Sequence, residues 1–119
     1  MALCDSTDFT CQAVAIENAL SRAPASELLR RRYRIVIVGW ADALALRTDA
    51  GKDVAQIELL QRALRADPSF GDAAVSLGVL LWRSGQKEEA RAALEHASKL
   101  EATRARATAL LQELANAPR

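Results

Sequence analysis

Residues 71–98, GDAAVSLGVLLWRSGQKEEARAALEHAS, decide the fold class of this chain. Residues that favour helices fill both halves of the stretch, and Ser84-Gly85-Gln86 separates the halves with a turn signal. In the second half, Ala90, Ala93 and Ala97 recur at intervals of three and four residues, which gives that helix one apolar face. The stretch therefore predicts two helices joined by a tight turn, with Gly85 in a left-handed conformation.

The same alternation of helical stretches and turn signals continues on both sides. It predicts about six helices, over residues 8–22, 26–48, 53–66, 71–84, 87–101 and 104–116. The chain has 119 residues with only 5 glycines, 3 prolines and 4% aromatic residues, a composition that excludes most all-β folds. We therefore expect an all-α protein built from antiparallel helical hairpins.

Residues 35–46, IVIVGWADALAL, are apolar on every side of a helix. A helix of this kind is stable only when neighbours pack all round it, so the segment is expected to form the central helix. A strand over residues 35–38 is the competing interpretation, because four β-branched residues follow one another there. No second strand to pair with it is evident.

The sequence also repeats itself weakly, since Gly51 and Gly85 lie 34 residues apart. Alignment of residues 37–70 with residues 71–104 gives four identities, Leu46/Leu80, Gly51/Gly85, Leu60/Leu94 and Ala63/Ala97. Alanine at 63 and 97 allows close approach of helices, and glycine at 51 and 85 allows the turn within each hairpin.

The pattern of these residues resembles the tetratricopeptide repeat family. The second copy carries the family's pattern at Leu77-Gly78, Leu81, Gly85, Ala90, Leu94 and Ala97, and departs from it at Ala74 and Ala102. The first copy carries it at Trp40, Gly51, Leu60, Ala63 and Pro68, and departs from it at Ala43-Leu44, Arg47 and Gln56. The resemblance implies a short solenoid of stacked hairpins.

We expect one domain over residues 1–119, divided into four parts. Residues 1–36 form N-terminal helices that cap the stack, residues 37–70 the first repeat, residues 71–104 the second, and residues 105–119 a C-terminal capping helix. Caps are needed because each hairpin relies on neighbours to cover its apolar face.

The resemblance implies a protein-interaction module, an adaptor, assembly factor or chaperone-like accessory, that binds a peptide or protein in a concave groove. Its groove-facing positions correspond here to Val38, Ala41, Asp42, Ala45, Asp72, Val75, Val79 and Trp82. Trp82 is either the anchor of this groove or a core residue that fills the space left by Ala74. Ala41, Ala45 and Ser76 replace the lysine and asparagine residues with which some relatives clamp a terminal carboxylate, so we expect no such clamp.

Catalytic, metal and cofactor sites find little support in the sequence. His96 is the single histidine and is expected on the solvated outer surface. Cys4 and Cys11 alone make an incomplete set of metal ligands and are interpreted as small, partly buried residues. If both lay on one helix, they would be too far apart to form a disulfide. A bond within one chain would require the residues before Asp8 to fold back, and the alternative is a bond between two molecules. No enzyme, metal or cofactor is predicted.

Arg30-Arg31-Arg32-Tyr33-Arg34 is the densest charge cluster of the chain. It is either a solvated face, with Glu27 pairing with Arg31, or a patch for an acidic partner or nucleic acid. The net charge of +1 makes nucleic acid the less favoured partner. A further alternative to the groove is self-association into a structural oligomer through the N-terminal hairpin or the repeat faces.

No stretch is long and apolar enough to cross a membrane, and the first residues do not resemble a secretion signal. We therefore expect a soluble, cytoplasmic protein, or a periplasmic or secreted one if a signal segment has been removed.

Overall fold

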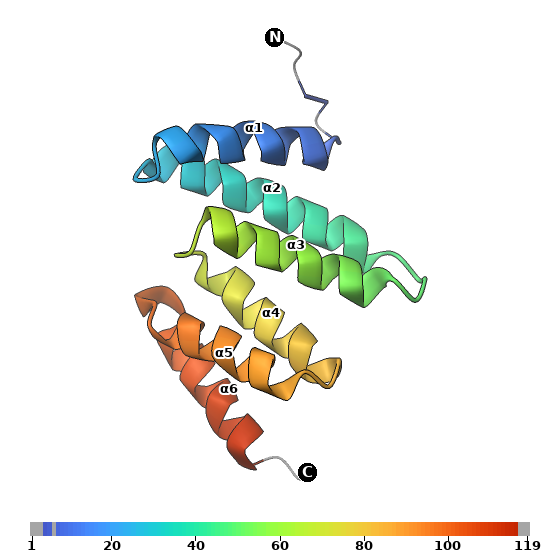
Figure 1. Ribbon diagram of the computed structural model, residues 1–119, viewed down its shortest axis with the longest axis vertical. Helices are drawn as coiled ribbons and strands as arrows, with labels where there is room; N and C mark the ends of the chain where they lie inside the picture. The colour runs from blue at the N-terminus through green and yellow to red at the C-terminus, as the bar shows by residue number, and fades with distance from the viewer. Residues whose placement is uncertain (1–3, 6, 117–119) are drawn as a thin grey trace. The chain divides into compact units, whose positions relative to one another are not determined.

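The computed structural model describes residues 4–5 and 7–116, and these residues form helices and no strand (Figure 1). The helices are α1 (Phe9–Arg22), α2 (Glu27–Ala45), α3 (Lys52–Ala66), α4 (Gly71–Arg83), α5 (Lys87–Ser98), the short 3-10 helix η1 (Glu101–Thr103) and α6 (Arg104–Asn116). The all-α fold is confirmed. The alternative of a strand over residues 35–38 is wrong, because these residues lie within α2.

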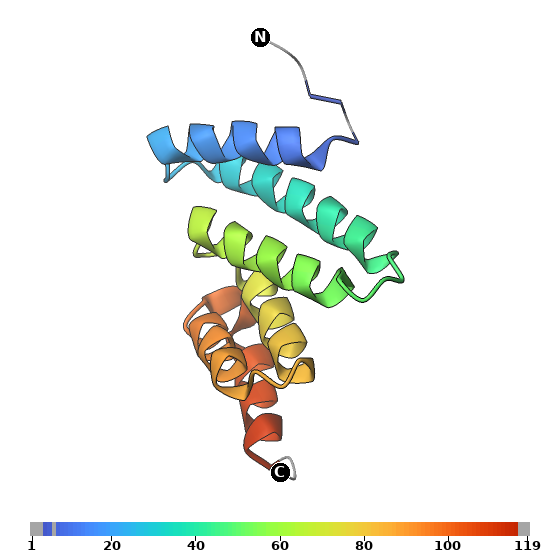
Figure 2. The ribbon, with the colours of Figure 1, turned by 45° about the vertical axis from the view of Figure 1, so that its right-hand side comes forward.

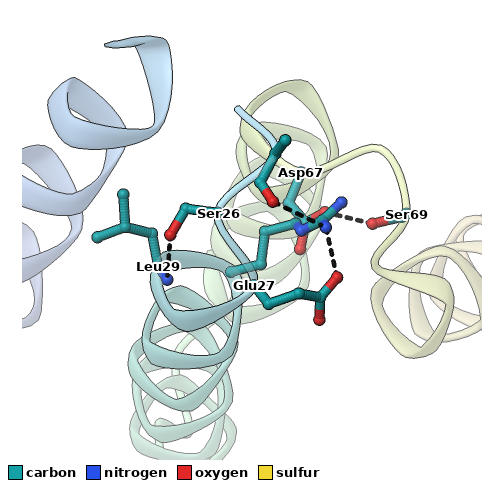
Figure 3. A network of polar contacts seen from close by, with 7 residues as sticks. Ser26, Glu27, Leu29, Asp67 and Ser69 are labelled. Carbon is teal, nitrogen blue, oxygen red and sulfur yellow. Dashed lines mark hydrogen bonds and ion pairs between the residues drawn. The ribbon is translucent and has the colours of Figure 1, made fainter. Parts of the chain in front are cut away.

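Side-chain caps fix where the first two helices begin. The Asp8 carboxylate accepts a hydrogen bond of 3.0 Å from the Cys11 N–H at the start of α1. Ser26 Oγ accepts one of 3.2 Å from the Leu29 N–H at the start of α2 (Figure 3). Each cap satisfies one of the backbone donors that a helix N-terminus leaves free.

Two helices end before the residues predicted from the sequence. α2 ends at Ala45 instead of residue 48, and the Arg47 Nε then donates to Asp49 Oδ1 at 2.8 Å in the following turn. α5 ends at Ser98 instead of residue 101, and Thr103 Oγ1 donates to the Ala97 carbonyl oxygen at 2.8 Å. That bond satisfies one of the free carbonyl groups at the C-terminus of α5.

The chain forms two compact units, Met1–Leu59 and Leu60–Arg119. In the N-terminal unit, α1 packs against α2 (Figure 2). Tyr33 is completely buried, and its hydroxyl donates a hydrogen bond of 2.6 Å to Glu17 Oε2. Phe9 and Trp40 stack with their ring centroids 6.4 Å apart. The other buried apolar residues of this unit are Ala13, Leu20, Val36, Ile37, Ile57 and Leu59.

The expectation that residues 35–46 form a helix buried on all sides is wrong. Val36 and Ile37 are buried, but Ile35 is 72% exposed, Val38 is 50% exposed and Leu46 is 84% exposed. With Tyr33, the two buried residues follow the three- and four-residue spacing of one helix face. α2 is therefore an amphipathic helix whose other face is also apolar in part.

In the C-terminal unit, α4 packs against α5 and α5 against α6 (Figure 2). Small side chains dominate its core, where Ala74, Val75, Ala97 and Ala107 form one buried cluster with Leu64 and Leu110 packed against it. Gly78 has no room for a side chain, because a Cβ there would lie 2.6 Å from Leu94 Cγ. Helices α4 and α5 can approach closely only because this position is glycine.

The two turn glycines predicted from the repeat differ in conformation. Gly85 has a φ of +83°, so the predicted left-handed turn between α4 and α5 is confirmed. Gly51 has no positive φ, and instead its N–H donates to Asp49 Oδ2 at 3.2 Å. The turn before α3 is thus built around the Asp49 side chain, and the hydrogen bond from Arg47 lowers the pKa of Asp49 to about 2.

Candidate binding surface

A pocket of about 260 Å³ lies on the surface of the C-terminal unit. Its walls come from three helices: Gly78, Val79, Trp82 and Arg83 of α4, Leu94 of α5, and Leu110, Glu113 and Leu114 of α6. The walls are mostly apolar, and the charged side chains of Arg83 and Glu113 contribute to the lining. Apolar walls with a few charged groups are typical of sites that receive a side chain or a small ligand.

Trp82 is half-buried in this pocket. The Lys87 ammonium at the start of α5 lies 5.2 Å from the centroid of the Trp82 ring. A cation over an indole face is attracted by the negative charge of the π system, which restrains the ring and keeps a positive charge beside it. The pocket therefore presents a flat apolar surface next to a cation.

Helix α4 carries four of the eight positions predicted to face a groove, and they have different surroundings. Val79 and Trp82 line the pocket. Val75 is buried at 6% exposure inside the small-residue core, which removes it from the accessible surface. Asp72 is exposed and forms an ion pair of 2.8 Å with Arg106 of α6. Of these four positions, Val79 and Trp82 therefore lie together in the pocket.

The other four positions, Val38, Ala41, Asp42 and Ala45, belong to α2 in the N-terminal unit. Val38, Asp42 and Ala45 are exposed and Ala41 is half-buried. Their spacing of three and four residues places them along one side of the helix. The eight predicted positions therefore divide equally between the two units.

Leu110 and Leu114 form an α6 wall of the pocket that was not predicted from the sequence. Residues 105–119 were expected only to form a capping helix, which has Leu110 and Leu114 among its apolar residues. Their i, i+4 spacing was the available signal, since it places both side chains on one face. Nothing in the sequence indicated that this face borders Trp82.

The arginine cluster of α2 contains two kinds of side chain. Glu27 pairs with Arg30 at 2.5 Å, so the predicted pair with Arg31 is wrong. Figure 3 shows Glu27 beside the first turn of α2. Arg34 is half-buried, whereas Arg31 and Arg32 are exposed. Among the residues that the structure describes, the side chains of Arg31 and Arg32 form no hydrogen bond or ion pair.

Cys4 and Cys11 form a disulfide with their Cα atoms 5.7 Å apart, which corrects their interpretation as merely small, partly buried residues. The fold-back that such a bond requires is present. The Asp8 N–H donates to the Asp5 carbonyl oxygen at 3.0 Å, and the Thr7 N–H donates to Asp5 Oδ1 at 2.9 Å. The second of these bonds lowers the pKa of Asp5.

No group of three potential metal ligands occurs among residues 4–5 and 7–116. His96 differs from the sequence expectation, because it is half-buried and its Nε2 lies 2.6 Å from the Pro68 carbonyl oxygen. This contact joins α5 to the turn before α4.

Among the described residues, 4–5 and 7–116, no helix has the length and apolar character needed to span a membrane.

Comparison with known proteins identifies the family of the C-terminal part of the chain. A family model described as tetratricopeptide repeat matches residues 52–114, which is more than half of the chain and covers α3 to α6 almost completely. No curated protein and no solved structure gives a match. The match includes the whole second copy of the repeat and its left-handed turn at Gly85, and the chain belongs to the tetratricopeptide repeat family.

Proposed function

We propose that this chain is a non-enzymatic adaptor whose Trp82 pocket receives an apolar side chain of a peptide or protein partner. Repeats of this family generally serve as protein-interaction scaffolds and have no catalytic activity of their own. The single observation that carries the proposal is the half-buried Trp82 among Val79, Leu110 and Leu114 in a cavity of about 260 Å³.

The chemistry of the pocket supports this assignment. Tryptophan is enriched among the residues that dominate binding energy at protein interfaces, because it buries a large area in one rigid group. Lys87 and Arg83 supply positive charge near the apolar walls, and Glu113 supplies negative charge. These groups can orient a partner whose polar atoms flank its buried side chain.

Affinity capture from an extract of the source organism, followed by mass spectrometry, tests the proposal. Partners captured by the wild-type chain should be lost with Trp82→Ala, and their affinity should fall by about 2 kcal/mol or more. Arg91→Ala is the matched control, because Arg91 is exposed on α5 and does not line the pocket. Equal capture by all three proteins would contradict the proposal.

Self-association is the rival function, and the exposed Ile35 and Leu46 favour it. Sizing over a range of concentrations separates the two functions. An adaptor remains monomeric on dilution, whereas a structural oligomer keeps its multimeric mass.

The Cys4–Cys11 disulfide supports a compartment outside the reducing cytosol, in place of the cytoplasmic location first expected. Thiol labelling of the protein in freshly lysed cells provides the test. Modification of both cysteines without prior reduction would argue for a cytosolic location.

A further inference from the structure

A second pocket of about 370 Å³ lies in the N-terminal unit, separate from the one around Trp82. Ala15 and Ile16 of α1 and Ile35 and Val36 of α2 provide its apolar walls. The remaining lining residues are Cys4, Gln12 and Arg32. The pocket is therefore large enough for a leucine or phenylalanine side chain and has a cation in its lining.

Two links hold the wall formed by Cys4 in place. The disulfide joins Cys4 to Cys11 in the first turns of α1. Gln12 Nε2 donates a hydrogen bond of 2.6 Å to the Asp5 carbonyl oxygen. The segment beside the pocket is thus anchored to α1 before any ligand arrives, which lowers the entropy cost of binding.

The surface of α2 next to the pocket is unusually apolar for an exposed helix face. Leu28 is 63% exposed, and Ile35 lies seven residues further along the helix. Arg32 stands between them, four residues after Leu28 and three before Ile35, so the three side chains form one row. A row of this kind matches a partner with apolar groups on both sides of a negative charge.

The charge of this row lacks a counterpart in the described part of the chain. Arg32 and its neighbour Arg31 make no ion pair there, whereas Glu27 is already engaged with Arg30. Arg32 is exposed and lines the pocket, so a carboxylate that lies beside the apolar walls can accept charge-assisted hydrogen bonds from its guanidinium.

We propose that this pocket binds a segment of another protein in which a leucine- or phenylalanine-sized side chain lies within one helical turn of a carboxylate. The apolar side chain packs against Ile16 and Ile35, and the carboxylate accepts hydrogen bonds from Arg32. The site is independent of the Trp82 pocket.

A second copy of this chain fits the row less well. In a two-fold contact centred on this row, the Arg32 side chains of the two copies would approach each other, and the repulsion would oppose association. Nucleic acid also fits less well, because a phosphate backbone leaves the apolar walls around Arg32 unfilled and the net charge of the chain is only +1.

The probe is a library of random 12-residue peptides displayed on phage and selected on the full chain. Peptides that also bind an Ile35→Ser variant are removed during selection. The enriched sequences should place Asp or Glu within four positions of Leu, Ile or Phe. Enrichment of apolar residues without an acidic one, or of no sequence at all, would overturn the proposal.

Calorimetry with one synthesised peptide then assigns the contacts. Arg32→Gln should weaken binding by about tenfold or more, since it removes a charge-assisted hydrogen bond. Replacing both cysteines with serine should also weaken binding, because it releases the Cys4 wall. Arg22→Gln is the matched control, being an exposed arginine of α1 outside the pocket, and should leave the affinity unchanged.

Trp82→Ala distinguishes this site from the one under the proposed function, and binding of the peptide should survive it. Loss of binding with Trp82→Ala but not with Arg32→Gln would overturn the inference while supporting the proposed function. A fall in the mass of the unliganded protein with Ile35→Ser would also overturn it, because a second copy would then occupy the row.

Discussion

The helix pairs α1/α2 and α4/α5 both bury apolar side chains between their helices, but the kinds of residue at the two contacts differ. In α1/α2, large side chains fill the seam, with Tyr33 completely buried and Phe9 stacked on Trp40, and a disulfide secures the N-terminal end of α1. In α4/α5, the helices approach each other where Gly78 lies under Leu94 and beside Ala90. The packing of α1 on α2 therefore depends on large side chains, whereas the packing of α4 on α5 depends on the absence of a side chain at Gly78.

This difference explains why the repeat pattern is clearer in the C-terminal unit. A large side chain in a core can be exchanged for another of similar volume at little cost, so such contacts specify residue identity weakly. A position without room for a Cβ accepts only glycine. The family match accordingly covers residues 52–114 and does not include α1 or α2.

The sharpest test of this comparison places alanine at one glycine of each pair. Gly78→Ala should destabilise the fold by about 2 to 3 kcal/mol, because the new Cβ would lie 2.6 Å from Leu94 Cγ and 3.3 Å from the Ala90 carbonyl oxygen. Gly39→Ala should be neutral or stabilising by up to about 1 kcal/mol, because alanine favours helices and the half-buried Phe9 ring can shift. Urea unfolding followed by circular dichroism measures both changes. Equal effects would remove the distinction between the pairs.

Loss of the disulfide should affect the N-terminal unit alone. Replacing Cys4 and Cys11 with serine opens a short covalent loop and should cost about 2 kcal/mol of stability there. Hydrogen exchange measured by mass spectrometry should show faster exchange in α1 and unchanged exchange in α5. Equally faster exchange in both helices would mean that the two units unfold together.

The two turn glycines should differ by a smaller amount. Gly85→Ala should cost about 1 kcal/mol, because its φ of +83° brings a Cβ into conflict with the backbone. Gly51→Ala should change stability little, since Gly51 has no positive φ and its nearest neighbour is the exposed Asp49 side chain. Thermal unfolding of the two variants gives the comparison, and a larger loss for Gly51→Ala would reverse our account of the turns.

The smallest effect concerns pH. The pKa of Asp49 is lowered from 3.8 to about 2, first by its hydrogen bond from Arg47. A depressed pKa stabilises the folded state above the unfolded value, so this contribution is complete above about pH 4 and disappears as the pH falls through 2. Titration of the Asp49 carboxyl carbon by NMR should give the low value, and Arg47→Ala should return it towards 3.8. An unchanged pKa in that variant would exclude the arginine as the cause.

Local sequence signals predicted most of the fold. Helix starts and the Gly85 turn depend on residues within a few positions, and these predictions agree with the structure. The disulfide depends on how the chain before Asp8 folds back, and the exposed side of α2 depends on which residues its neighbours cover. The fold-back is a local backbone conformation that the spacing of the two cysteines does not determine, and the exposure of α2 depends on packing against other segments.

The candidate sites also combine residues that the sequence indicated with residues that depend on the packing of the helices. Val79 and Trp82 were found from the repeat register, but the burial of Val75 and the contribution of Leu110 and Leu114 follow from how α6 packs in the C-terminal unit. The sequence analysis expected Glu27 to pair with Arg31, whereas Glu27 pairs with Arg30, and the side chains of Arg31 and Arg32 form no ion pair among the described residues. The residue types in the sequence indicated where a binding surface could lie, but the packing of the helices determines which residues line each pocket.

The distribution of the tryptophans gives each unit its own optical reporter. The chain has two tryptophans, with Trp40 stacked on Phe9 in the N-terminal unit and Trp82 beneath Lys87 in the C-terminal unit. Variants that keep one indole at a time would let fluorescence follow each unit separately. Emission from Trp40 would report events near the disulfide, and emission from Trp82 would report occupation of its pocket. The protein thus carries an intrinsic fluorescent probe in each unit, and the one in the C-terminal unit lines the Trp82 pocket.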